Sequence, residues 1–251
     1  KYINWGIIGY GNASTQFIES FGLDENNKIE ALGSITKKEI LELHKNKINK
    51  FTNLYTEVIN NSNIDIVFIG LPNHMHFEWA KLALIKKKSV LIEKPACTNS
   101  SEFEELISLA QEKGVYIFEG IYFRSHTNIQ KIFEIIDNIN FGEIKSLTAV
   151  LGNDALGGKK LFGLRLKKPK KSNRLFNPAC FGGSIWDLGC YPIVFANIFI
   201  KKYTNKYLSV SDVIKVKRTM GPTDVDLQSE LELIADKIEI NLKTSLINTL
   251  K

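Results

Sequence analysis

Two segments far apart in the sequence carry side chains that could exchange a proton with a substrate. Ile92-Glu93-Lys94-Pro95 supplies a lysine, and Trp186-Asp187-Leu188-Gly189-Cys190-Tyr191 supplies a carboxylate and a tyrosine. General acid–base catalysis works best when the pKa of the group lies near ambient pH, whereas free tyrosine and lysine titrate at about 10 and about 10.4. A lysine ammonium close to a tyrosine favours the phenolate. We therefore expect Lys94, Tyr191 and Asp187 to handle protons together.

Each of these residues also has a plainer interpretation. Lys94 could be an ordinary lysine at the end of a strand. Tyr191 could be a core aromatic residue that opens an apolar helix through Phe195 and Ile198. What favours the chemical interpretation is a third segment, at the start of the chain.

That third segment is a glycine-rich turn, which predicts a dinucleotide site. Gly6-Ile7-Ile8-Gly9-Tyr10-Gly11-Asn12-Ala13-Ser14 has the form G-x-G-x-x-small, after a predicted strand and before a predicted helix. Gly9 would permit the tight turn, and Gly11 would let the backbone approach a pyrophosphate at the helix N-terminus, which begins at Asn12. Ser14 stands where Gly or Ala is usual. The alternative is a tight turn that binds no ligand.

The end of the second predicted strand indicates which dinucleotide is preferred. An acidic residue there would hold the ribose 2′-hydroxyl of NAD. The chain instead reads Gly33-Ser34-Ile35-Thr36-Lys37-Lys38, and Glu30 lies too early, inside the strand. Ser34 and Lys37 could accommodate a 2′-phosphate, so we predict NADP, with NAD as the second choice. The alternative is that the two lysines lie on a helix surface.

Hydrophobic patterning divides the chain near residue 120. In the first half, short apolar strands alternate with amphipathic helices, which implies parallel pairing with helices on both faces. We predict strands at 3–8, 29–33, 65–70, 89–92 and 115–118, and helices at 12–21, 37–47, 76–87 and 100–113, the last capped by Ser100. The second half predicts a helix at 128–136, then strands at 144–151 and 212–220 and a hairpin of 226–235 with 237–246. The alternation in the hairpin is typical of an antiparallel sheet with one covered face.

Composition limits the class of protein. With 251 residues, 44% of them hydrophobic, the chain can bury the core of one large or two modest domains. Its longest strongly apolar stretches, 64–71 and 191–200, are shorter than the roughly 18–20 residues that span a bilayer, so we expect no membrane segment. The three cysteines lack metal-type spacing, and the histidines at 74 and 76 have no completing ligands. We expect a cytoplasmic protein without a metal site.

The net charge of +6 is concentrated in one segment. Between Lys159 and Arg174 there are eight basic residues and no acidic one, which leaves the rest of the chain slightly acidic. This segment is either a solvated loop or a patch for an anionic ligand, such as a phosphorylated or nucleotide-linked substrate. We do not expect nucleic acid as a partner, because no recognition motif accompanies the charges.

Taken in order, these segments resemble the Gfo/Idh/MocA family, which includes glucose–fructose oxidoreductase, inositol dehydrogenase and relatives. The resemblance extends along essentially the whole chain. Its motifs are Gly9-Tyr10-Gly11, Leu71-Pro72-Asn73-His74-Met75-His76, Glu93-Lys94-Pro95, Phe118-Glu119-Gly120, Phe123-Arg124, Gly142-Glu143-Ile144, Gly182-Gly183 and Asp187-Leu188-Gly189-Cys190-Tyr191. Within the family, Tyr191 is similar to the dihydrodiol dehydrogenase, xylose dehydrogenase and sugar 3-ketoreductase branches, since the inositol dehydrogenase branch usually has histidine there.

The resemblance implies a fold with two domains. Residues 1–120 would form a Rossmann dinucleotide-binding domain with a doubly wound parallel sheet. Residues 121–251 would form an α+β domain with an open-faced, mainly antiparallel sheet for substrate binding and oligomerisation. Family members usually run some tens of residues longer, so we expect this sheet to be shortened. Three explanations stay open: the chain is a fragment, disordered residues follow it, or a partner covers the exposed sheet edge.

The resemblance also implies an activity and its site. The chain would be an NAD(P)-dependent oxidoreductase that transfers a hydride between nicotinamide and the carbonyl or hydroxyl of a sugar, sugar derivative or polyol. Lys94 and Tyr191 would lie where nicotinamide meets substrate, and Asp187 would orient a substrate hydroxyl or the lysine. The residues implied to line the cofactor are Pro72, Asn73, His76 and Glu93. Homo-oligomers through the second sheet are expected. The alternative is a dinucleotide-binding homologue with a regulatory role and no turnover.

Overall fold

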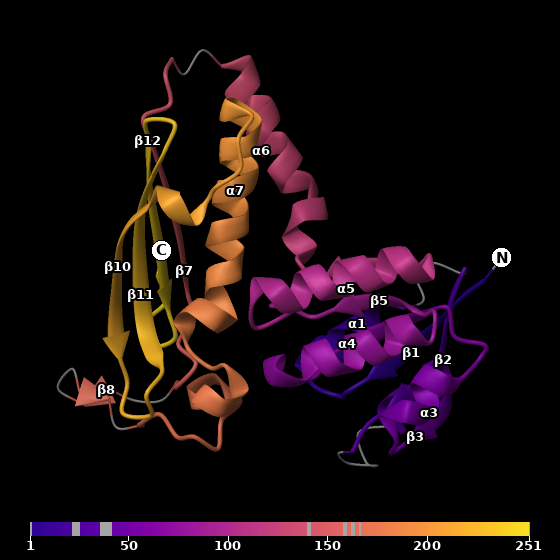
Figure 1. Ribbon diagram of the computed structural model, residues 1–251. Coiled ribbons are helices and arrows are strands. Elements are labelled where there is room, and N and C mark those ends of the chain that lie inside the picture. Colours follow the sequence, from indigo (N-terminus) through magenta and orange to yellow (C-terminus); the bar gives the residue numbers. More distant parts are fainter. Residues whose placement is uncertain are drawn as a thin grey trace. The chain divides into compact units, whose positions relative to one another are not determined.

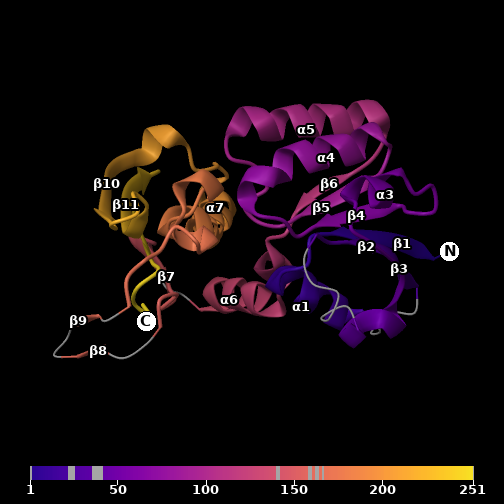
Figure 2. The same cartoon turned by 90° about the horizontal axis from the view of Figure 1, so that it is seen from below.

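The computed structural model describes residues 2–21, 26–35, 42–139, 142–157, 160–161, 164–165 and 167–250. The chain forms two compact units, Lys1–Gly120 and Ile121–Lys251, shown in Figures 1 and 2. We call them unit 1 and unit 2 and describe each by itself.

Unit 1 is built on a six-stranded parallel sheet with the strand order β3-β2-β1-β4-β5-β6. The strand order reverses direction between β1 and β4, which is the position where doubly wound sheets bind ligands. The strands are β1 (Ile3–Ile8), β2 (Asn27–Gly33), β3 (Ile48–Thr52), β4 (Ile66–Ile69), β5 (Ser89–Ile92) and β6 (Ile117–Glu119).

Helices cover both faces of this sheet because successive strand residues point to opposite sides. Ile7 packs with Ile18 of α1, whereas its neighbour Ile8 packs in a cluster with Val58 and Leu106. Figure 2 shows α4 and α5 on one side of the sheet and α1 on the other. The helices are α1 (Asn12–Ser20), α3 (Tyr55–Asn60), α4 (His76–Ile85) and α5 (Ser100–Lys113), with the short 3₁₀ turns η1 (Glu42–Lys47) and η2 (Asn73–Met75). The predicted doubly wound parallel fold is confirmed.

Unit 1 differs from the sequence expectation between residues 37 and 60. Residues 36–41 lie outside the described part, and residues 42–47 form a 3₁₀ turn rather than the α-helix that we expected. Strand β3 and helix α3 were not predicted at all. The cap of α5 is Asn99, not Ser100, since the Asn99 side chain accepts a hydrogen bond of 2.9 Å from the Glu102 N–H.

Unit 2 contains a four-stranded sheet with the order β10-β11-β12-β7. The β10–β11 and β11–β12 pairs are antiparallel, but β12 and β7 are parallel. The hairpin turn expected after Ala235 is confirmed, with Asp236 and Lys237 both at positive φ. The elements are η3 (Tyr122–Ser125), α6 (Thr127–Asn138), β7 (Ser146–Gly152), β8 (Lys160–Leu161), β9 (Leu164–Arg165), η4 (Arg174–Phe176), η5 (Pro178–Cys180), η6 (Ile185–Gly189), α7 (Cys190–Thr204), η7 (Val210–Asp212), β10 (Val213–Met220), β11 (Asp226–Ala235) and β12 (Ile238–Ser245).

Helices cover one face of the unit 2 sheet. Phe199 and Ile200 of α7 pack against Leu233, Ile240 and the rest of a core cluster to which α6 also contributes. The intervening strand residues point away from this core, so the opposite face carries charged side chains. Cross-strand ion pairs of 3.4–3.9 Å join Lys243 to Glu230 and both Lys215 and Lys217 to Glu232. The predicted open-faced sheet domain is confirmed.

The helical run Pro178–Thr204 is longer than the apolar stretch seen in the sequence. It includes an 18-residue window with a mean hydropathy of 1.3, so by length and composition alone it could cross a membrane. This is weak evidence, because the core helix of a soluble protein passes the same test. Ala196 and Ile200 of this run are fully buried against the sheet of unit 2, which is the packing of a core helix.

Candidate active site

The glycine turn of unit 1 is held between three strand ends. The Gly9 N–H donates to the Gly33 carbonyl at 2.9 Å, and the Gly70 N–H donates to the Ile8 carbonyl at 2.9 Å. Gly9 has a φ of +89°, and a Cβ added there would lie 2.6 Å from the Gly70 carbonyl oxygen. Glycine is therefore required at position 9 by both backbone conformation and space.

Gly11 is open in the way that a bound pyrophosphate needs. It is the N-cap of α1, no side chain caps that helix end, and no acidic residue lies in its first turn. A Cβ added at Gly11 would meet no described atom within 4 Å. The unpaired N–H groups and the positive end of the helix dipole favour an anion there. The turn and Asn12, the first residue of α1, thus fit a dinucleotide.

Ser14 packs α1 against β4, the task that usually falls to Gly or Ala in this turn. Its side chain is fully buried, and a Cβ on Gly70 would overlap with the Ser14 Oγ. Within the described residues that Oγ has no hydrogen-bond partner. Ser14 therefore fits at this position because its side chain is small, and not because its hydroxyl makes a hydrogen bond.

One of the two residues predicted to select NADP is placed by the structure. Ser34 follows β2 directly, is 8% exposed, and its N–H donates to the Thr52 carbonyl at 3.0 Å. This puts it at the strand end where the ribose of a dinucleotide is recognised. Lys37 lies outside the described residues.

The loop after β4 brings Pro72, Asn73 and His76 to the same sheet edge. Asn73 is buried, and His76 is fully buried at the start of α4. The His76 ring lies between two carbonyl oxygens, with Nε2 2.7 Å from Leu71 and Nδ1 2.8 Å from Pro95. It therefore joins the loop after β4 to the loop after β5 from the inside. Cofactor contacts of Pro72, Asn73 and His76 stay predictions.

The loop after β5 carries Glu93 and Lys94, both half-buried. The Glu93 N–H donates to the Ile69 carbonyl at 3.0 Å, which extends the sheet by one rung, and the Lys94 N–H donates to the Glu93 carboxylate at 3.3 Å. Glu119 holds the next turn by accepting from the Ala96 N–H at 2.9 Å. Because parallel strands end at one edge, Lys94 lies at the edge that also carries the glycine turn.

Cys97, three residues beyond Lys94, does not add a nucleophile. Burial, and to a smaller extent the carboxylates of Glu102 and Glu119, raise the pKa of its thiol to about 12. The thiol is therefore protonated at neutral pH and fills space as a small apolar group.

Tyr191 lines a cavity of about 550 Å³ that lies within unit 2. The rings of Tyr122 and Phe123 each lie 6.0 Å from the Tyr191 ring, centroid to centroid. The remaining lining comes from β7 and the residue after its last glycine, from η6 and from α7: Thr148, Ala149, Val150, Leu151, Asn153, Leu188, Pro192 and Phe195. A largely apolar cavity with a few polar groups is typical of a small-molecule site. Sequence reasoning did not predict its aromatic wall, although Phe123 stands in one of the family motifs.

Asp187 lies four residues before Tyr191 on a π-helical turn, η6, that leads directly into α7. Such turns are rare and occur often at functional sites. Arg174 approaches the Asp187 carboxylate, with Nη1 3.4 Å and Nη2 3.5 Å from Oδ1. The basic segment recognised in the sequence thus ends beside a candidate site residue. The excess of basic charge was its only signal, and it did not identify this pair.

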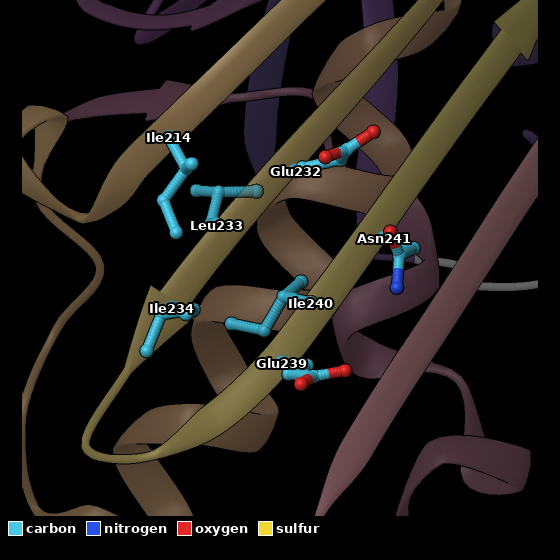
Figure 3. A pocket seen from close by; sticks show the side chains of 7 residues that line it. All are labelled: Ile214, Glu232, Leu233, Ile234, Glu239, Ile240 and Asn241. Atoms are coloured by element: carbon cyan, nitrogen blue, oxygen red, sulfur yellow. The ribbon is translucent and has the colours of Figure 1, made fainter.

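A second hollow, of about 260 Å³, lies on the unit 2 sheet and is shown in Figure 3. Its lining comes from three adjacent strands: Ile214, Glu232, Leu233, Ile234, Glu239, Ile240 and Asn241. Neither Asp187 nor Tyr191 contributes to it. Across the described part of the chain, no group of three His, Cys, Asp or Glu residues could hold a metal ion.

The sequence of unit 1 matches a family model described as "Oxidoreductase family, NAD-binding Rossmann fold" over residues 3–121. D-xylose 1-dehydrogenase (NADP(+)) of Hypocrea jecorina is 28% identical over 204 residues, which cover 76% of this chain and 51% of that protein. Trans-1,2-dihydrobenzene-1,2-diol dehydrogenase of Xenopus laevis is 24% identical over 199 residues, covering 77% and 56%. The chain spans about half the length of such curated relatives.

The fold of both units recurs in a solved structure. A 3-ketoreductase from Actinomadura kijaniata, in complex with NADP and TDP-benzene, has a TM-score of 0.84 at 20% identity, covering 99% of this chain and 71% of that one. Sheet order, glycine turn and sequence match together define unit 1 as a Rossmann domain of the type found in NAD-binding oxidoreductases. Residues 3–121 belong to the Gfo/Idh/MocA oxidoreductase family, which confirms the resemblance drawn from the motifs.

Proposed function

We propose that the protein is an NADP-dependent oxidoreductase that interconverts a hydroxyl and a carbonyl group on a sugar or nucleotide-linked sugar. The observation that carries the proposal is the open glycine turn. Position 9 must be glycine because a Cβ there would meet the Gly70 carbonyl, and Gly11 leaves the space before an uncapped helix end clear. This arrangement suits pyrophosphate binding. Without such a ligand, the N–H groups at the start of α1 would have no side chain to cap them.

NADP is preferred over NAD because the end of β2 lacks a carboxylate. Ser34 occupies the described position there, and Thr36, Lys37 and Lys38 follow in the sequence. Hydroxyl and ammonium groups suit a 2′-phosphate, whereas the ribose 2′-hydroxyl of NAD is usually held by Asp or Glu. Relatives that carry NADP in their names support the same choice.

When bound, the nicotinamide supplies or accepts the hydride. The residues of this chain handle the accompanying proton. In the reductive direction Tyr191 donates its phenolic proton to the oxygen that becomes a hydroxyl, and the Lys94 ammonium stabilises negative charge on that oxygen. Asp187 accepts a hydrogen bond from a neighbouring substrate hydroxyl. In the oxidative direction the proton returns to Tyr191.

A sugar-like substrate is supported by the names of the relatives, which include a D-xylose dehydrogenase and dTDP-sugar 3-reductases. Arg174, beside Asp187, gives the site a guanidinium that could contact a phosphorylated substrate. We therefore rank nucleotide-linked keto sugars and sugar phosphates ahead of neutral polyols as substrates.

The test is a fluorescence titration with NADPH and NADH, followed by a panel of carbonyl substrates in which NADPH oxidation is measured. We expect tighter binding of NADPH and turnover with at least one keto sugar. Binding of NADPH without oxidation across the panel would favour the regulatory, non-catalytic alternative. Absence of binding to either dinucleotide would refute the proposal at its base.

We also propose that the open face of the unit 2 sheet joins two copies of the chain. This face presents alternating rows of lysine and glutamate on neighbouring strands, with Lys217, Glu232, Glu230 and Lys243 among them. Two such faces related by a two-fold axis could pair their rows with opposite charge. Light scattering after size exclusion should give a dimer mass that falls towards the monomer as salt is raised.

A further inference from the structure

A buried carboxylate lies behind the helix that carries Asp187 and Tyr191. Asp226, the first residue of β11, is 5% exposed, and its Oδ2 accepts three hydrogen bonds. The donors are the Ser184 hydroxyl at 2.6 Å, the Ser229 hydroxyl at 2.8 Å and the Ile185 backbone N–H at 2.9 Å. Nothing in the substrate cavity requires this residue, since Asp226 does not line it.

The hydrogen bonds continue into the sheet. The Thr244 hydroxyl donates to the Ser184 hydroxyl at 3.0 Å, and Ser184, Ser229 and Thr244 are all almost fully buried. Ser229 lies on β11 and Thr244 on β12, the two central strands of the unit. A buried polar network in which each hydroxyl proton has an acceptor specifies one arrangement of its members. The network thus joins the start of η6 to the middle of the sheet.

Asp226, which lies on β11, caps the N-terminal end of the helical turn η6. The Ser184 side chain makes no local capping bond at the start of η6, and the Ile185 N–H instead finds the Asp226 carboxylate. A negative charge at a helix N-terminus is favoured by the helix dipole. Gly183 is fitted to this contact, because it has a φ of +121° and a Cβ there would overlap with Asp226 Oδ1.

We propose that Asp226 is a positioning residue for the active site. Through Ser184 and Ile185 it fixes the position of η6 relative to the sheet and its rotation about the helix axis. It therefore determines where Asp187 and Tyr191 lie, two and six residues after Ile185. Its effect on chemistry passes through Tyr191. The kinetic part of this inference rests on the proposed function; the structural part does not.

The test uses the full chain with Asp226→Asn, Asp226→Ala and Ser229→Ala. The matched control is Glu134→Gln, which removes an exposed carboxylate from α6 of the same unit, outside both the network and the open face of the sheet. A 3-fluorotyrosine placed at position 191 reports the environment of that ring by ¹⁹F NMR. Kd for NADPH, kcat, KM and the pH dependence of kcat are measured for each folded variant.

We expect the ¹⁹F resonance to move in all three network variants, most in Asp226→Ala and least in Ser229→Ala, and to stay in place in Glu134→Gln. We expect kcat per folded molecule to fall at least tenfold in Asp226→Asn with a displaced pH profile, while Kd for NADPH changes less than twofold. If Asp226→Ala does not fold, Ser229→Ala and Asp226→Asn decide the result.

A merely structural role would lower thermal stability and leave the ¹⁹F resonance, kcat per folded molecule and pH profile as in the wild type, and that result would overturn the inference. A wild-type protein without turnover removes the proposed function only. A ¹⁹F resonance that moves in Asp226→Asn and stays in place in Glu134→Gln would still support Asp226 as the residue that positions Tyr191.

Discussion

Replacing Gly11 by alanine separates dinucleotide binding from folding. Gly11 has φ −116° and ψ −171°, which alanine adopts readily, and its added Cβ meets no described atom within 4 Å. Alanine is a poorer helix N-cap than glycine, by roughly 0.5–1 kcal/mol. Alanine also makes the unfolded chain less flexible than glycine does, which stabilises the folded state by about 0.4–1 kcal/mol and offsets the poorer cap. We expect the free energy of unfolding to change by less than about 0.5 kcal/mol.

Binding of NADPH should respond quite differently. The new methyl group occupies the space through which a pyrophosphate would reach the N–H groups at the start of α1. Displacement of one charge-assisted hydrogen bond removes about 1.5–3 kcal/mol. Since each 1.4 kcal/mol is a factor of ten, Kd should rise between about tenfold and 150-fold.

The assay combines urea unfolding with NADPH fluorescence titration, and two other glycines serve as controls. Gly114→Ala, at the C-terminal end of α5, also meets open space but has a φ of +67°, so it should lower stability and leave Kd unchanged. Gly9→Ala should prevent folding of unit 1, because its Cβ meets the Gly70 backbone. A stable Gly11→Ala protein with wild-type affinity for NADPH would show that the turn is not the cofactor cradle.

Three further substitutions test other parts of the account. Tyr191→Phe should lower kcat by about 10²-fold or more, the usual contribution of a general acid, with Kd for NADPH unchanged; steady-state kinetics would show an unaltered kcat if the assignment were wrong. Lys88→Met should cost about 1–3 kcal/mol in urea unfolding, because the carbonyls of Asn61 and Ile64 lose their buried donor. Burial lowers the pKa of Lys88 in the folded chain. Between that lowered pKa and the unfolded value of about 10.4 the unfolded chain holds more protons at this group, so in the wild type Lys88 makes the unfolding free energy rise with pH across that window. The Lys88→Met variant should lack this rise, and its persistence would contradict the argument. Ser14→Ala should raise the free energy of unfolding by about 1 kcal/mol, and with it the melting temperature, because a buried hydroxyl without a partner is removed. A lower melting temperature would mean that this hydroxyl has a partner.

The features predictable from the sequence were those with strong local signals. The apolar runs of β1 and β4 are buried on both faces, so they read as continuous hydrophobic segments. The turn at Gly9 combines a positive φ with close backbone packing, which only glycine permits. The β11–β12 hairpin is indicated by the alternation of polar and apolar residues on either side of Asp236 and Lys237.

The features that were missed depend on non-local contacts. Strand β3 contains Asn49 and Lys50 because it is an edge strand with one exposed side, so its pattern is weak. The parallel pairing of β7 with β12 joins segments about ninety residues apart, and no local periodicity encodes it.

Candidate site residues show the same division. Lys94 and Tyr191 stand in motifs that can be read directly in the sequence. The contact between Arg174 and Asp187 and the three hydrogen bonds to Asp226 arise only when loops and strands meet in the fold. Neither Arg174 nor Asp226 has a neighbouring sequence signal that would have assigned it to this site.

Hydride transfer between NADPH and a carbonyl carbon is the activity that we propose for this protein. Deuterium at both C4 positions of the reduced nicotinamide reports this transfer, whichever of the two hydrogens moves. The products of a keto-sugar panel are then examined by mass spectrometry. We expect one deuterium on the carbon that becomes the carbinol, and more label from deuterated NADPH than from deuterated NADH. The proposed activity would be contradicted if NADPH bound to the protein but kept all its deuterium, and every carbonyl compound of the panel stayed unreacted.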